Sequence, residues 1–146
     1  RRWKKISRII KTLIKNKISV MGHIGVLPQS DKIFKLKGKK KSEGNKILED
    51  AKLLENAGVF CIVLECVETS LAKLVTKNIN IPTIGIGASK HCDGQILVSD
   101  DLIGLNPINV KFVKKYSNIR KQISKAVSNY AMEVKKSKFP NKKHTY

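Results

Sequence analysis

Two side chains of this sequence could carry out acid–base chemistry, and the first is Glu65. It is the single charged residue of the apolar run 59–67. A carboxylate in such surroundings is costly to bury unless it is paired or its pKa is raised, and a carboxylate of that kind can act as a general base. Residue type and position leave a second interpretation equally open, in which the Glu65 side chain points outward past the end of a strand.

The second side chain is His23, which stands between two glycines in Gly22-His23-Ile24-Gly25. A lone histidine in an apolar segment is more often structural than functional. Glycines, however, let a backbone or a ligand approach closely. The spacing therefore favours a functional role for His23 near the end of a strand.

The three cysteines, by contrast, predict neither a zinc site nor a disulfide framework. Cys61, Cys66 and Cys92 form no CxxC pair, and their number is odd. Three adjacent residues rarely converge on one ion, so His91, Cys92 and Asp93 are interpreted as a polar loop. We therefore expect free thiols in a reducing cytoplasm.

Alternating helices and strands would position these residues. Apolar residues at helical spacing predict helices over 3–15, 47–57, 69–75 and 119–134. Apolar runs predict strands over 18–21, 59–67, 82–87 and 95–98. Thr69 and Ser117 are the expected caps of the last two helices. A Lys-rich loop is expected over 29–44 and a polar basic tail over 139–146.

The order of these elements predicts an α/β fold. No pair of strands is joined by a tight hairpin turn, so parallel packing is favoured. Such elements build either a doubly wound sheet or a (β/α)₈ barrel, and both gather functional groups at the carboxyl ends of strands. No GxGxxG follows the first strand and no GxxxxGK[ST] is present, so the usual nucleotide-binding fingerprints are missing.

Composition narrows the function classes further. The 146 residues carry a net charge of +19, but only four of the 30 basic residues are Arg and aromatic residues make up 5%. Nucleic-acid binders use arginine for bidentate contacts and aromatic rings for stacking. The charge is therefore interpreted as a lysine-rich solvated surface rather than a nucleic-acid site. No apolar run approaches the roughly 18 residues of a membrane span, and no secretory-signal pattern follows the basic start.

Four strings occur in one order: VMGHIGVLPQS (20–30), VLECVETSLAKLVT (63–76), IPTIGIGAS (81–89) and CDGQILVSDDLIGL (92–105). Together with the ending FPNKKHTY they closely resemble the ketopantoate hydroxymethyltransferase family, over nearly the whole chain. The resemblance implies a (β/α)₈ barrel of the phosphoenolpyruvate/pyruvate superfamily. It also implies hydroxymethyl transfer from 5,10-methylenetetrahydrofolate to 3-methyl-2-oxobutanoate, with a divalent metal, usually Mg²⁺, on the keto acid.

Residue by residue, the resemblance gives Glu65 in LECV the role of proton acceptor and His23 in GHIG the role of a contact to the keto acid. The family's metal-binding carboxylates and its substrate-binding lysine and serine lie on its first four strands, which have no counterpart in this sequence. No metal ligand is therefore expected in this chain. The resemblance also implies small-molecule partners, a homo-oligomer in the full-length family, and neither nucleic acid nor membrane.

Chain length bears on how much of that barrel is present. A whole barrel typically needs about 250 residues, and the first methionine of this chain is Met21. The resemblance places Arg1 in the helix after the fourth strand. Residues 1–146 are therefore expected to form a single incomplete domain that supplies strands five to eight, as the C-terminal half of such an enzyme, inactive alone.

Two alternatives stay open beside this interpretation. The chain is either one half of a split enzyme, completed by a separate N-terminal polypeptide, or, with charge as its only support, a basic RNA-binding module.

Two segments also depart from the family pattern, residues 31–44 and residues 88–94. These departures bear on the local contacts to the keto acid and the folate.

Overall fold

The computed structural model describes residues 2–29 and 35–146. Arg1 and residues 30–34, which include the start of the altered 31–44 segment, lie outside the described residues. The chain divides into two compact units, Arg1–Ile96 and Leu97–Tyr146. Each unit is described by itself, and the single incomplete domain stays a prediction.

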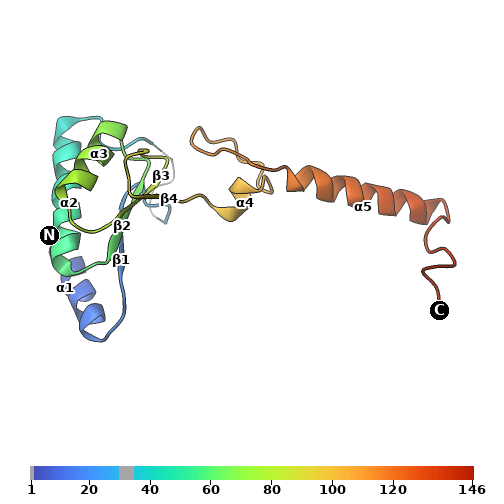
Figure 1. The fold of residues 1–146 in the computed structure, drawn as a ribbon, viewed down its shortest axis with the longest axis horizontal. Coiled ribbons are helices and arrows are strands. Elements are labelled where there is room, and N and C mark those ends of the chain that lie inside the picture. Colours follow the sequence, from blue (N-terminus) through green and yellow to red (C-terminus); the bar gives the residue numbers. More distant parts are fainter. Residues whose placement is uncertain (1, 30–34) are drawn as a thin grey trace. The chain divides into compact units, whose positions relative to one another are not determined.

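A parallel sheet of four strands, in the order β1-β2-β3-β4, forms the centre of the first unit (Figure 1). The chain therefore has the predicted α/β class with parallel pairing. The elements of this unit are α1 (Arg2–Lys15), β1 (Met21–Gly25), α2 (Lys41–Ala57), β2 (Cys61–Glu65), α3 (Thr69–Asn78), β3 (Thr83–Ile86) and β4 (Gly94–Gln95).

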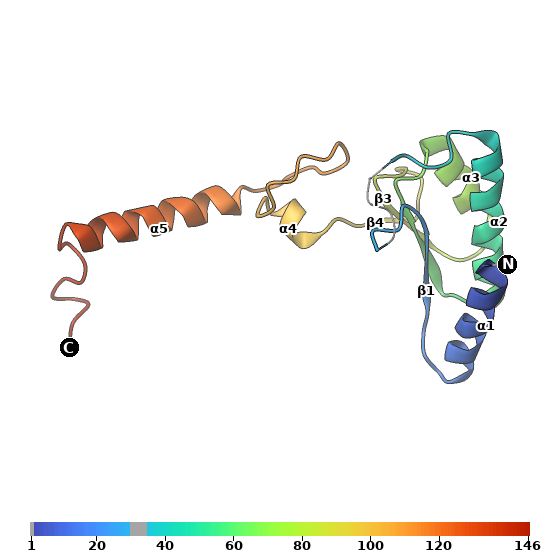
Figure 2. The same cartoon turned by 180° about the vertical axis from the view of Figure 1, so that it is seen from behind.

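The helices of this unit lie on one side of the sheet (Figure 2). Alternate strand residues point to opposite faces, and Ile24, Ile62 and Leu64 point to the helices. These three side chains are buried in one core with apolar residues of α2 and α3, such as Leu54 and Val75. Burial of this apolar surface on one face stabilises the unit and fixes the register of each strand, because a one-residue slip would turn every apolar side chain away from the helices.

The first and fourth strands differ from their predicted positions. β1 covers Met21–Gly25 instead of 18–21, because Ile18 is exposed and its amide is still bonded to the end of α1 through the carbonyl of Leu13. His23 therefore lies within the strand and not in a loop after it. β4 is only Gly94–Gln95 instead of 95–98, since Val98 already precedes a further helix and is half exposed.

The helix caps also differ from the predicted residues. Glu68, and not Thr69, caps α3, because its carboxylate accepts a hydrogen bond from the amide of Leu71 at 3.0 Å. Asn118, and not Ser117, caps the final helix by accepting from the amide of Lys121. α2 begins within the predicted loop 29–44, at Lys41.

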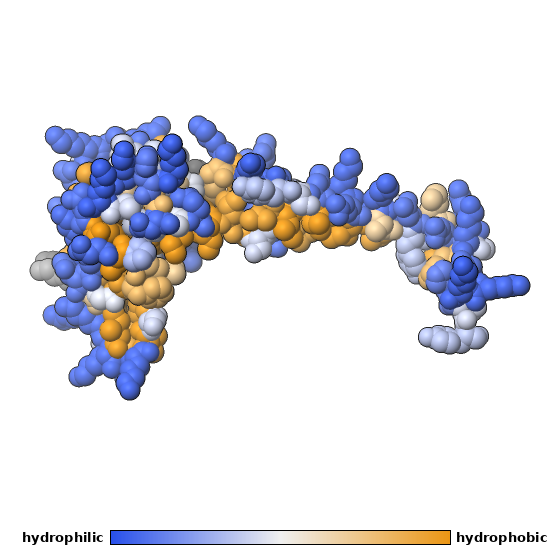
Figure 3. Space-filling model, in the orientation of Figure 1, coloured by the Kyte–Doolittle hydropathy of each residue, from blue (hydrophilic) through white to orange (hydrophobic). Residues whose placement is uncertain are grey.

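The second unit contains two helices, α4 (Ser99–Leu102), which the sequence did not predict, and α5 (Ile119–Lys135). Apolar side chains lie along one side of α5 and polar ones along the other (Figure 3). None of the residues of α5, all of them described, is buried. No helix in the described part of the chain is long and apolar enough to cross a membrane.

Candidate active site at the ends of two strands

β1 and β2 place the two predicted site residues on the same face of the sheet. Gly25 is paired with Glu65 and His23 with Val63 in the parallel register. His23 is two residues before Gly25, so its side chain points to the same face as Glu65. This is the face opposite the helices, and it brings Nε2 of His23 to 3.0 Å from Oε2 of Glu65.

The pair differs in exposure. The Glu65 side chain is 7% exposed and that of His23 is 34% exposed. The Nε2 atom itself is buried and makes no hydrogen bond among the described residues, although it lies 3.0 Å from Oε2 of Glu65. A buried nitrogen without a hydrogen bond is unfavourable, so the contact with Glu65 leaves the hydrogen bonding of this ring incomplete.

Apolar side chains surround the pair on its own face. Val63 lies next to His23, Ile86 is paired with Glu65, and Ile84 is paired with Val63. All three are only partly buried. An apolar setting strengthens the electrostatic interaction of any charge placed there.

The main chain holds the end of β2 from two sides. The carbonyl of Glu65 accepts a hydrogen bond from the amide of Val26, and the amide of Cys66 donates to the carbonyl of Ile86, both at 2.9 Å. The carbonyl of Cys66 accepts from the amide of Lys37 at 2.8 Å. The backbone that carries the Glu65 side chain is therefore fixed on both neighbouring elements.

Sequence reasoning missed Cys66 as part of this site. Its φ is 51°, in the left-handed region that side chains with a Cβ seldom adopt. Burial raises the pKa of its thiol, and the charge of Glu65 raises it further. Nothing in the residue type signals this backbone conformation, because cysteine has no preference for it.

The other candidate residues have structural roles. Asp93 accepts hydrogen bonds from the amide and the hydroxyl of Thr83, at 2.8 and 3.0 Å. This agrees with the interpretation of residues 91–93 as a polar loop. The three cysteines, all within the described residues, are buried and free, as expected.

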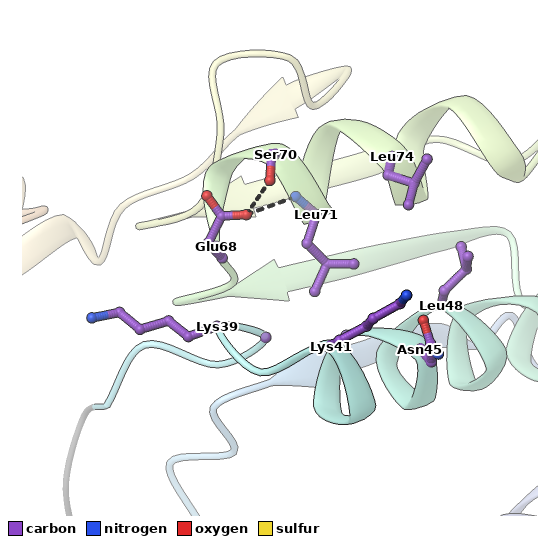
Figure 4. A pocket seen from close by; sticks show the side chains of 10 residues that line it. Lys39, Lys41, Asn45, Leu48, Glu68, Ser70, Leu71 and Leu74 are labelled. Atoms are coloured by element: carbon purple, nitrogen blue, oxygen red, sulfur yellow. Dashed lines mark hydrogen bonds between the residues drawn. The ribbon is translucent and has the colours of Figure 1, made fainter.

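A cavity of about 370 Å³ lies elsewhere, between the first turns of α2 and α3 (Figure 4). Lys39, Lys41 and Glu68 are among its lining residues, whereas His23 and Glu65 are not. The Glu68 carboxylate at its edge already accepts from Ser70 and Leu71, which lowers the pKa of Glu68. The cavity is therefore separate from the candidate site.

Comparison with known proteins decides the family. Residues 2–142 match the family described as ketopantoate hydroxymethyltransferase. The chain belongs to this family. The resemblance inferred from the four sequence strings is thus confirmed, and the parallel α/β sheet is consistent with the phosphoenolpyruvate/pyruvate-type superfamily.

Individual relatives of the ketopantoate hydroxymethyltransferase family carry the name 3-methyl-2-oxobutanoate hydroxymethyltransferase. The protein of Pelagibacter ubique (strain HTCC1062) is 66% identical over 143 residues, which are 98% of this chain and 56% of that relative. The protein of Clostridium botulinum (strain 657 / Type Ba4) is 49% identical over 145 residues, which are 97% of this chain and 53% of that relative. The chain spans about half the length of the curated relatives it matches.

The divalent metal implied by the family does not fit the residues of this chain that the structure describes. Among the described residues, no group of three or more His, Cys, Asp or Glu side chains could hold a metal ion. His23 and Glu65 alone offer one carboxylate, whereas Mg²⁺ binds through several oxygen ligands.

Proposed function

We propose that this chain supplies the proton-accepting side of a ketopantoate-forming active site. Ketopantoate formation joins a one-carbon unit, carried by 5,10-methylenetetrahydrofolate, to C3 of 3-methyl-2-oxobutanoate. The observation that carries the proposal is the contact of His23 with the buried Glu65, at 3.0 Å, on the apolar face of the sheet. Membership of the family indicates which reaction the two side chains would carry out.

Glu65 takes the role of proton acceptor. The C3 hydrogen of the keto acid is acidic, because loss of the proton leaves charge that the neighbouring ketone delocalises. The carboxylate accepts that proton, and the electron pair of the former C3–H bond forms the new C–C bond to the one-carbon unit. The methylene carbon loses both of its C–N bonds, one in exchange for the new C–C bond and one in exchange for a hydroxyl group from water, and tetrahydrofolate leaves. A base inside an apolar setting and next to the reacting atom contributes about 10²–10⁴-fold to such a step.

His23 takes the role of a contact to the keto acid. Its buried Nε2 has no hydrogen-bond partner among the described residues, and it lies beside the base. A hydrogen bond from this ring to an oxygen of the substrate would hold C3 against Glu65. A hydrogen bond of this kind contributes mainly to binding of the keto acid.

The rest of the site would come from the other half of the barrel. Four parallel strands are half the strands of a (β/α)₈ barrel, and the chain covers 56% and 53% of two relatives. We assign this chain strands five to eight. The missing strands would bring the metal ligands and further contacts to the keto acid and the folate, so we expect this chain to be inactive alone.

A chimera tests this function. The N-terminal part of the Pelagibacter relative, outside the matched region, is joined to this chain, and ketopantoate formation is assayed with Mg²⁺, methylenetetrahydrofolate and 3-methyl-2-oxobutanoate. We expect turnover by the chimera and none by this chain alone. A folded chimera without turnover, beside an active Pelagibacter protein, would contradict the proposal, and so would full turnover by the chain alone.

A second arm of the same assay distinguishes a split enzyme from one continuous protein. The two halves are purified as separate polypeptides and mixed. If the chain works as part of a split enzyme, the mixture gains activity and the halves co-elute on a sizing column. Activity of the covalent chimera only, with no association of the separate halves, favours one continuous protein.

A further inference from the structure

The end of β2 is bonded to the chain on both of its sides. The peptide group between Glu65 and Cys66 is bonded through its carbonyl to Val26 and through its amide to Ile86. Val26 directly follows β1, and Ile86 is the last residue of β3. Both neighbouring strands therefore fix the plane of this one peptide group, and with it the direction of the Glu65 side chain.

Gly25 is required for the first of these bonds. Its φ is +100°, and a Cβ at this position would lie 2.1 Å from the carbonyl oxygen of Glu65. No contact of that length is tolerated, and the colliding atom is backbone, which cannot swing aside as a side chain can. Any residue other than glycine would push the Glu65 carbonyl away from Val26.

Cys66 provides the second constraint. Its left-handed backbone, with φ 51°, turns the chain immediately after Glu65. The turn lets the carbonyl of Cys66 accept from Lys37, while its amide still reaches Ile86. The left-handed conformation is unfavourable for a residue with a Cβ. Such a conformation is retained only where the surrounding interactions hold it in place, and this is common at functional sites.

We propose that Gly25 and Cys66 are positioning residues, which together hold the Glu65 carboxylate against the His23 ring. This role rests on the proposed function of Glu65 as proton acceptor. Neither residue needs to touch the substrate. Both act through the backbone of Glu65. Gly25 leaves room for the Glu65 carbonyl, and Cys66 makes the left-handed turn that follows Glu65.

Nuclear magnetic resonance of this chain tests the positioning without any need for activity. The change in the His23 ring nitrogen resonances caused by Glu65→Gln is recorded first, as the signature of a lost contact. We expect Gly25→Ala and Cys66→Val to give the same signature and to speed hydrogen exchange at the amides of Val26 and Cys66. Valine is chosen because β-branched residues disfavour a positive φ most strongly.

Matched variants separate positioning from a general loss of stability. Gly58→Ala places a Cβ at another positive φ, +94°, at the end of α2 and away from Glu65. Gly94→Ala adds a Cβ in β4 at an ordinary 3.7 Å contact. Both should leave the His23 resonances unchanged. Cys66→Gly should also keep them unchanged, because glycine adopts the left-handed conformation freely.

A folded Gly25→Ala or Cys66→Val variant with unchanged His23 resonances and unchanged exchange at Val26 overturns the positioning role. Loss of the fold in both variants, while Gly58→Ala still folds, also overturns it, because the two residues would then serve the fold as a whole. If only one of the two folds, that variant decides.

Steady-state kinetics of the chimera test whether the position of Glu65 affects the reaction rate. In a folded Gly25→Ala chimera we expect kcat to fall on the order of 100-fold, the effect of a misplacement near 1 Å, with a KM for the keto acid changed much less. A KM effect with an unchanged kcat contradicts the proposal. If Glu65→Gln leaves the chimera active, the function proposed for Glu65 is wrong. The resonance experiment still tests whether Gly25 and Cys66 position the Glu65 carboxylate, because it does not depend on activity.

Discussion

Glu65 and His23 meet because of the parallel register of two short strands. Side chains two residues apart on neighbouring strands share a face, and here that face is the one without helices. The sequence left the orientation of Glu65 open. In the structure its side chain is 7% exposed and faces His23, which removes the interpretation of a carboxylate that points past the strand into solvent.

Cys66 reports on the charge of Glu65. Because burial and the neighbouring carboxylate both raise the pKa of its thiol, a smaller fraction of thiolate is present at a given pH. Replacement of Glu65 by Gln removes the negative charge and lowers that pKa. We predict alkylation of Cys66 by iodoacetamide at pH 8 to become roughly two- to ten-fold faster in Glu65→Gln.

Cys61 is the internal control for this measurement. Its pKa is raised by burial alone, so its alkylation rate should not respond to the same substitution. Each rate is followed by mass spectrometry of the peptide that contains the cysteine. Equal rates for Cys66 in both proteins would contradict an effect of Glu65 on the pKa of the thiol.

His23 should act on substrate binding more than on the chemical step. In the chimera, His23→Gln removes the imidazole and is predicted to raise KM for the keto acid by about 10- to 100-fold, the worth of one hydrogen bond to a charged group. His91→Gln is the matched control, since His91 is exposed in a loop. A KM that stays within two-fold of the parent's in steady-state assays would remove the proposed contact.

At the scale of elements, the parallel α/β order was predictable, because apolar runs and helical spacing reflect burial directly. The caps and the strand ends were not. Glu68 and Asn118 cap their helices in place of the neighbouring Thr69 and Ser117, which have equally suitable side chains. Such one-residue choices depend on backbone geometry, as does the left-handed Cys66, and no residue pattern encodes them.

Asp93 ties the loop before β4 to β3. Its carboxylate is bonded to the amide of Thr83, a fully buried residue. Asp93→Ala would leave that amide without this acceptor, and we predict a loss of about 1–3 kcal/mol in the free energy of unfolding, measured by urea denaturation. Asp100→Ala, at an exposed position, should change it by less than about 0.5 kcal/mol. Equal losses in the two variants would show that the Thr83 bonds contribute nothing.

At the scale of the whole molecule, β1 is the first strand of the sheet and pairs, among the described residues, with β2 alone. A parallel strand at a sheet edge keeps unpaired backbone groups, which favour pairing with a further strand. In the proposed barrel that strand belongs to the N-terminal half. This assignment of a neighbouring strand rests on the family and on the length of the relatives. The four strands alone do not predict it.

Hydrogen exchange tests the closure of the barrel. When the separately purified N-terminal half of the Pelagibacter relative is added, the amides of β1 are predicted to exchange at least about ten-fold more slowly, because edge groups gain partners. Amides in β2, which already has strands on both sides, should change less. Association of the halves without added protection at β1 would argue against closure at this edge.

Proton abstraction by Glu65 is the central claim, and one measurement tests it most directly. The chimera is incubated in D₂O with 3-methyl-2-oxobutanoate and Mg²⁺ but no folate, and deuterium at C3 is followed by proton resonance. We predict exchange by the parent chimera and a rate lower by about 10²–10⁴-fold in Glu65→Gln, while Glu68→Gln exchanges as the parent does. A Glu65→Gln chimera that is folded and exchanges at the parent rate would contradict the claim.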